Sequence, residues 1–129
     1  MTVLVVDLAN VVGSRPDGWW RDRAGAAARL LARLAALPPE VPGPDGAVLG
    51  VGATVAVVEG AARDVPRPDG VSLVRAPGSG DDALVAVVGE LVAAGREVLV
   101  VTADRGLRAR LPAGVPVAGP GWLRDRLDA

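Results

Sequence analysis

The segment VLVVDLANVV, Val3 to Val12, decides how the rest of the chain is interpreted. Its first four residues, Val3 to Val6, form a continuous apolar run, which is typical of a parallel strand covered on both faces. A carboxylate, Asp7, and an amide, Asn10, interrupt the apolar residues that follow. Because ligands bind beyond the carboxyl ends of parallel strands, the pattern predicts that Asp7 ends the strand at a binding edge of the sheet.

Strand-like and helix-like segments alternate along the rest of the chain. The Pro- and Gly-rich stretch 38–53 predicts a surface loop with a short strand at its end. This order predicts a single α/β domain over residues 1–129, with three Rossmann-like layers and a mostly parallel sheet of about five strands in the order 3-2-1-4-5 along the chain. We expect strands at 3–6, 54–60, 70–76, 97–104 and 114–118, and helices at 19–37, 81–94, 105–111 and 119–127.

Composition excludes several kinds of chemistry. Half of the 129 residues are apolar, but no apolar stretch reaches the roughly 18 residues that a membrane span needs. Cys and His are absent, which excludes thiolate catalysis, a Ser-His-Asp triad and His-bound zinc. All 14 basic residues are Arg, a bias typical of a high-GC bacterial genome, and the net charge of −1 gives no global basic field. We expect a cytoplasmic protein without a secretory signal.

Acidic residues at strand ends and helix starts are the candidate site. Three Pro-Asp-Gly triplets predict turns, which gives Asp17, Asp45 and Asp69 an ordinary role. Of the remaining acids, Asp7 and Asp104 end expected strands, and Asp81 and Asp82 begin a helix that leads toward the same edge. Carboxylates gathered there would repel one another, and Mg²⁺ or Mn²⁺ would relieve the repulsion through hard oxygen ligands.

Each of these acids also has an ordinary structural explanation. Asp7 can accept hydrogen bonds from a neighbouring loop, and Asp104 can cap the helix that follows it. Ser79 and Asp82 have the spacing of a helix capping box, so Asp81 is the better candidate metal ligand of the adjacent pair. Both explanations stay open at this point, and the joint placement of the acids favours the metal site.

Three segments resemble the NYN domains of the PIN-like nuclease superfamily. The segment VVDLANVV resembles the D-x-x-N motif that opens these domains, GSGDDALVAVV their acidic helix start, and VLVVTADRGLRARL a later strand in which a hydroxyl residue and an Asp precede a helix. Their order and approximate spacing agree with the family over nearly the whole chain. No single motif is specific, but together they identify the chain as a candidate member.

The resemblance implies a metal-dependent ribonuclease that hydrolyses RNA phosphodiester bonds with Mg²⁺ or Mn²⁺. It assigns Asp7, Asp81 and Asp104 to the acidic cluster, with Asp82 as a substitute or supporting ligand. Asn10 would orient Asp7 or a metal-bound water, and the Thr102 hydroxyl would lie near the ion. The family often has a fourth acid on an early helix, for which the nearby candidate here is Asp22.

The segment NVVGSRPDGWWRDR follows Asp7 and is expected to overhang the site. Its Trp19 or Trp20 can stack on a base of single-stranded RNA. Alternatively, at least one of these Trp packs the helix onto the sheet and Asp22 pairs with an Arg. The candidate phosphate contacts are Ser14, Arg15, Arg21, Arg23 and Arg105. We expect Trp122 in the core, and Arg108, Arg110, Arg124 and Arg126 on solvated helix faces.

Three functions remain in competition. The first is the metal-dependent ribonuclease, and the second is a phosphohydrolase that acts on free nucleotides. The third is a catalytically weak PIN-like module that binds RNA or protein. No membrane partner is expected, and Ala-rich helices with apolar edges permit a homodimer. An Arg-lined groove leading to the acids favours a polymer substrate, whereas a closed pocket favours a nucleotide.

Overall fold

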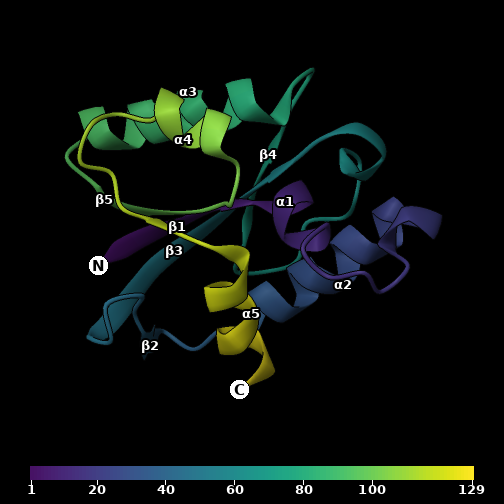
Figure 1. Ribbon diagram of the computed structural model, residues 1–129, viewed down its shortest axis with the longest axis horizontal. Helices are drawn as coiled ribbons and strands as arrows, with labels where there is room; N and C mark the ends of the chain where they lie inside the picture. Colours follow the sequence, from purple (N-terminus) through teal and green to yellow (C-terminus); the bar gives the residue numbers. More distant parts are fainter.

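A computed structural model describes all residues, 1–129, as a mixed α/β fold with helices on both faces of a twisted sheet. Figure 1 shows the sheet running through the middle of the molecule, with the N-terminal strand inside it. None of the helices has both the length and the apolar character that crossing a membrane requires.

Five strands form the parallel part of the sheet. The first, β1 (Thr2–Asp7), lies between β3 (Val48–Val58) and β5 (Glu97–Val101), while β4 (Ser72–Arg75) pairs with β3 and β6 (Val117–Ala118) pairs with β5. This is the expected order 3-2-1-4-5. All four residues from Val3 to Val6 are buried, because β1 has neighbours on both edges and helices over both faces.

A sixth strand makes the sheet mixed. Residues of β2 (Glu40–Pro42) pair antiparallel with the start of β3, within the stretch expected to be mainly a loop. The sequence predicted that the strand corresponding to β3 starts at residue 54, whereas β3 begins at Val48. A Pro-Asp-Gly turn joins β2 to β3: Gly46 has a φ of 86°, and Asp45 Oδ1 accepts a hydrogen bond from the amide of Ala47 at 3.0 Å.

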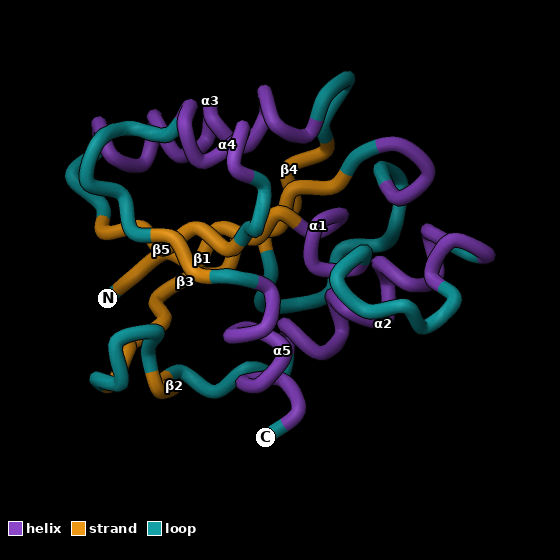
Figure 2. Tube along the Cα trace, viewed as in Figure 1, coloured by secondary structure: helices purple, strands orange, loops and turns teal.

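Helices cover the two faces unequally. On one face lie α3 (Gly80–Ala93) and α4 (Arg105–Arg110), and on the other lie α1 (Leu8–Val12), α2 (Arg23–Ala35) and α5 (Pro120–Asp128) (Figures 1 and 2). Each face has its own apolar core, and the one under α1, α2 and α5 is the larger. The three expected layers are therefore present.

The helix expected over residues 19–37 is interrupted. Trp19–Arg21 forms the short 3-10 helix η1, and α2 starts only after Asp22, whose carboxylate accepts a hydrogen bond from the amide of Gly25 at 2.9 Å. The extended backbone of Asp22 (φ −152°) breaks the helical path, and its side chain caps the new helix. Apolar periodicity alone does not detect such a break, because the side chains on both sides of it face the core.

Two short helices follow strand ends where none was expected. The chain turns into α1 immediately after Asp7, and Gly60–Ala62 forms the 3-10 helix η2 soon after β3 ends at Val58. Similarly, β5 ends at Val101 rather than at Asp104. As a result, the side chains at these strand ends are held by turns and helix caps instead of by further strand pairing.

Arg124 is buried, contrary to the expectation of a solvated helix face. Its guanidinium donates hydrogen bonds to the carbonyl of Val11 at 2.7 Å and to Ser14 Oγ at 3.1 Å. These acceptors lie in and just after the last turn of α1, whose carbonyls have no partner within the helix. Arg124 therefore connects α5 to α1, the helix that follows Asp7.

Replacement of Arg124 by Met should destabilise the protein by about 2–3 kcal/mol, because the apolar side chain leaves the carbonyl of Val11 without its charged donor. Arg108→Met is the matched control, since Arg108 is exposed and its side chain forms no hydrogen bond or ion pair. Urea unfolding of the two variants checks the difference. Equal stability of the two would contradict a tethering role for Arg124.

Candidate functional site

A hydrogen bond between neighbouring strands anchors the candidate site. Thr102, just after β5, donates its hydroxyl proton to Asp7 Oδ2 at the end of β1, with 2.9 Å between the oxygens. The same Thr102 Oγ1 accepts a hydrogen bond from the amide of Asp104 at 3.1 Å. Thr102 is 1% exposed. The buried hydroxyl therefore fixes the rotamer of Asp7 and the direction in which the chain leaves β5.

Asn10 and Asp104 hold the loop that follows β5. Asn10 Oδ1 accepts a hydrogen bond from the amide of Ala103 at 2.8 Å and so joins α1 to this loop. Asp104 Oδ1 accepts one from the amide of Leu107 at 3.0 Å and caps α4. The ordinary capping role considered for Asp104 is therefore present. Its second carboxylate oxygen has no hydrogen-bond partner.

Glu59 is an acid that the sequence reasoning missed. It follows β3, and its Oε2 accepts a hydrogen bond from the amide of Gly80 at the start of α3, with 2.8 Å between the atoms. A Cβ on Gly80 would lie 2.7 Å from the Glu59 carboxyl carbon, so the carboxylate rests directly on the backbone. The detectable signal was an acid directly after an apolar strand, as at Asp7.

Repulsion and burial act on two of these acids. The pKa of Asp7 is raised above its ordinary value, mainly because burial disfavours the charged form, although the hydroxyl of Thr102 partly opposes the shift; Asp81 and Glu59 raise it further. The pKa of Asp81 is also raised, by burial first and then by Asp104 and Glu59. Four carboxylates from four different elements thus share one electrostatic environment.

Asp82 and Asp22 have other partners. Asp82 is exposed and pairs with Arg110 of α4, with 2.7 Å between carboxylate and guanidinium, and its amide donates a long hydrogen bond (3.5 Å) to the capping Ser79. Arg110 is exposed, as expected, and this ion pair lies at the surface. Asp22 caps α2, so the fourth acid near the cluster is Glu59. These contacts favour the structural explanation for Asp82 and Asp22.

The oxygen ligands suit a hard divalent cation, but they do not form a closed cage. No three acidic side chains converge closely enough to surround a metal ion. Asp7, Glu59 and Asp104 each direct one oxygen to a protein donor. Mg²⁺ keeps several waters and needs only one or two carboxylates. Asp7 and Asp81 are the residues that would hold such a largely hydrated ion at the sheet edge.

A hollow of about 260 Å³ borders this acidic edge. Glu59 lies on its wall, together with Trp19, Arg23 and apolar residues of α1, α2 and η2. The Arg23 guanidinium stacks over the Trp19 ring at 5.4 Å, while the Trp19 ring also packs against the larger core. Part of the Trp19 ring is therefore core, as the structural explanation expected, and another part lines an open surface.

The other expected substrate contacts are dispersed. The Ser14 hydroxyl donates to the carbonyl of Val11 at 2.6 Å and accepts from Arg124, and Arg15 pairs with Asp128 at 3.0 Å. Trp20 is half exposed, with the Arg21 guanidinium 6.0 Å from its ring centre. Arg105 is exposed beside Asp104 and forms no ion pair. Ser14 is therefore held by the protein itself, whereas the arginines keep donors that face solvent.

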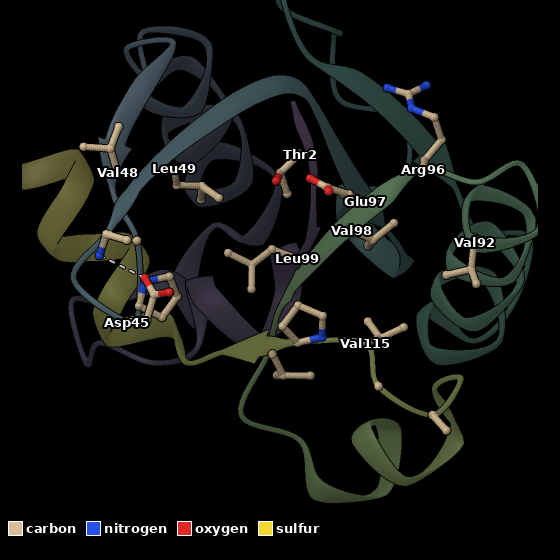
Figure 3. Close-up of a pocket in the computed structure, with 17 residues that line it drawn as sticks. Thr2, Asp45, Val48, Leu49, Val92, Arg96, Glu97, Val98, Leu99 and Val115 are labelled. Atoms are coloured by element: carbon tan, nitrogen blue, oxygen red, sulfur yellow. Dashed lines mark hydrogen bonds between the residues drawn. The ribbon is translucent and has the colours of Figure 1, made fainter.

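A second hollow, of about 560 Å³, lies at the opposite edge of the sheet. Figure 3 shows Thr2 and Glu97, which begin their strands, on its wall with Leu49 and Val115. It is mainly apolar and contains none of the four acids of the cluster. Trp122 lies elsewhere, partly buried against the larger core, and donates its indole N–H to the carbonyl of Pro42 at 3.1 Å.

Comparison with known proteins supports the fold. No protein-family profile and no curated protein matches the sequence. Among solved structures, the chain is similar to Rae1 (YacP) from Bacillus subtilis, determined as a W164L mutant, with a TM-score of 0.70 and 16% sequence identity. The alignment covers 99% of this chain and 76% of the Rae1 chain. At this identity the likeness shows a shared fold.

Substitution of Gly80 by Ala tests whether Glu59 is held by the start of α3. Ala favours a helix by about 1 kcal/mol over Gly, but its Cβ would meet the Glu59 carboxylate at 2.7 Å. Because this carboxylate ends a flexible side chain, we expect the variant to fold with stability within about 1 kcal/mol of wild type and with Glu59 displaced. A crystal structure checks this; an unmoved Glu59 would contradict it.

Asp7→Asn should stabilise the protein without divalent ions at pH 7, by about 1 kcal/mol. The raised pKa means that ionised Asp7 opposes folding; this cost is absent below the unfolded pKa of 3.8 and grows as the pH rises through the folded pKa. The Asn carbonyl oxygen can still accept from Thr102. Thermal unfolding from acid to neutral pH should show a gain that disappears in acid. A less stable variant at pH 7 would refute this.

Proposed function

We propose that this protein is a metal-dependent ribonuclease of the NYN type, within the PIN-like superfamily, and that it hydrolyses phosphodiester bonds in single-stranded RNA. The observation that carries the proposal is the gathering of Asp7, Glu59, Asp81 and Asp104 at the carboxyl edge of one sheet. This edge is where open α/β folds bind their ligands. The shared fold with Rae1 supports the architecture of the proposal.

In this proposal Asp7 and Asp81 hold Mg²⁺ or Mn²⁺; burial first, and then neighbouring carboxylates, raise the pKa of both residues. When bound, such an ion lowers the pKa of a coordinated water and stabilises charge on a phosphoryl oxygen. Thr102 keeps Asp7 in its rotamer, and Asn10 fixes the adjoining loop. The chain lacks His, so these carboxylates and the ion supply the acid–base chemistry.

The surface beside the acids favours a polymer over a free nucleotide. The hollow next to Glu59 presents the Trp19 ring and the Arg23 guanidinium, which suit a base and a phosphate respectively. The Trp20 ring packs edge-on against Trp19 with ring centres 5.8 Å apart, and the Arg21 guanidinium lies 6.0 Å from the Trp20 ring centre. A strand of RNA can therefore extend beyond the acidic edge, whereas a nucleotide enzyme would enclose its substrate.

The lack of a preformed three-carboxylate cage favours one alternative. A protein with this arrangement could retain the fold and bind RNA while cleaving it weakly or not at all. The proposed ribonuclease requires the acids to act together only when an ion is present. Activity and binding therefore need separate measurements.

Cleavage of a labelled single-stranded RNA with Mn²⁺ tests the proposal. Asp7→Asn should reduce the rate at least about 100-fold, and Asp81→Asn should also reduce it strongly, because each removes a proposed ligand. Asp82→Asn, one residue away, should retain most of the activity, since this carboxylate pairs with Arg110. EDTA should abolish cleavage in all of them.

Two outcomes would exclude the ribonuclease. Phosphate or pyrophosphate release from nucleoside triphosphates, without RNA cleavage, would identify a nucleotide phosphohydrolase. A folded wild-type protein that is inactive on both substrates would identify a binding module. Equal rates for wild type and Asp7→Asn would show that any activity comes from a contaminant or from another site.

A further inference from the structure

Four arginines surround a hollow that is separate from the acidic cluster. The hollow has a volume of about 200 Å³ and lies between the end of α1, the outer face of α2 and α5. The arginines come from three parts of the sequence, and one Asp, Asp17, is also on the wall. They are Arg15, Arg29, Arg33 and Arg124.

The carboxylates nearby do not balance these arginines. Asp128 pairs with both Arg15 and Arg33, and its pKa is lowered by those hydrogen bonds. Arg29 has no ion-pair or hydrogen-bond partner. With Asp17 included, the group keeps a surplus of two positive charges, although the whole chain carries a net charge of −1.

Arg124 is the one buried arginine of the four. Its pKa is lowered, first by burial and then by the positive charge of Arg15, while Asp17 opposes the shift and Arg33 adds to it. The guanidinium of Arg124 is fixed in place by its bonds to Val11 and Ser14. Arg124, fixed at the base, and the more exposed Arg15, Arg29 and Arg33 around it form a basic recess, whose surplus positive charge an oxyanion would neutralise.

The recess and the acidic edge are connected through one short helix. Asp7 precedes α1, and Val12, its last residue, lies on the wall of the recess. Val12 also lines the hollow that contains Trp19. Five helical residues rise about 8 Å, so one extended strand can reach both ends of α1.

We propose that this recess binds a phosphate of the single-stranded RNA whose scissile bond lies at the acidic edge. The inference rests on the proposed function and adds to it a second anchor for the substrate. Phosphate contacts of this kind position a strand without reading its sequence. The arginines suit them because each presents several donors in a planar arrangement.

Binding is measured with the Asp7→Asn protein in EDTA, so that no cleavage occurs, using a short fluorescent oligoribonucleotide and, separately, inorganic phosphate. Adding Arg29→Gln should weaken RNA binding about fivefold, the upper effect of one exposed charge contact, and should reduce the salt slope by about 0.7. Adding Asp128→Asn should strengthen binding, because it frees Arg15 and Arg33.

Arg96→Gln is the matched control, since Arg96 lies at the opposite edge of the sheet and should leave RNA affinity unchanged. Equal weakening by Arg29→Gln and Arg96→Gln would overturn the proposal, as would weaker binding by Asp128→Asn. Inorganic phosphate that binds as tightly as the oligonucleotide would overturn the assignment to a strand.

Failure of the recess and failure of the ribonuclease can be told apart. Binding that depends on Arg29, in a protein whose wild type does not cleave RNA, would leave the recess intact and reject the enzyme. Cleavage that depends on Asp7, together with RNA affinity that Arg29→Gln leaves unchanged, would support the ribonuclease and reject the recess.

Discussion

The parallel pairing of β1 with both β3 and β5 is the constraint on which the rest of the structure depends. It brings the carboxyl ends of three strands to one edge, although they are distant in the sequence. Asp7 ends β1, and Glu59 and Asp104 follow the other two strands. The first turn of α3 adds Asp81 to this group. The acidic cluster is therefore a consequence of topology, because no local motif places these side chains together.

The buried charge of Asp7 destabilises the folded protein, and hydrogen bonds from uncharged donors partly offset this cost. The structure contains no arginine paired to Asp7, and burial makes its charge unfavourable. The hydroxyl of Thr102 and the amide of Gly80 satisfy Asp7 and Glu59 without neutralising them. The negative potential that remains at these acids would attract a cation. The exposed Asp82, in contrast, is already paired with Arg110. Asp82 therefore has an arginine partner within the protein, whereas Asp7 has none.

Much of the fold followed from the sequence because the signals were local. The apolar run from Val3 to Val6 predicted a central strand, and the glycines of the Pro-Asp-Gly turns have positive φ. The missed features depend on tertiary contacts. Arg124 looks solvated in the stretch LRDR but faces the carbonyls of α1. Glu59 follows an apolar strand as Asp7 ends one, but its role becomes visible only through its contact with Gly80.

The hydrogen bond between Asp7 and Thr102 joins residues that are 95 positions apart. During translation, the first strand must therefore wait for most of the chain to leave the ribosome before its second neighbour exists. The contact from Arg124 to Val11 is added later still. A nascent chain without Thr102 and Arg124 lacks the supports of its acidic edge, so the arrangement forms only after both residues have left the ribosome.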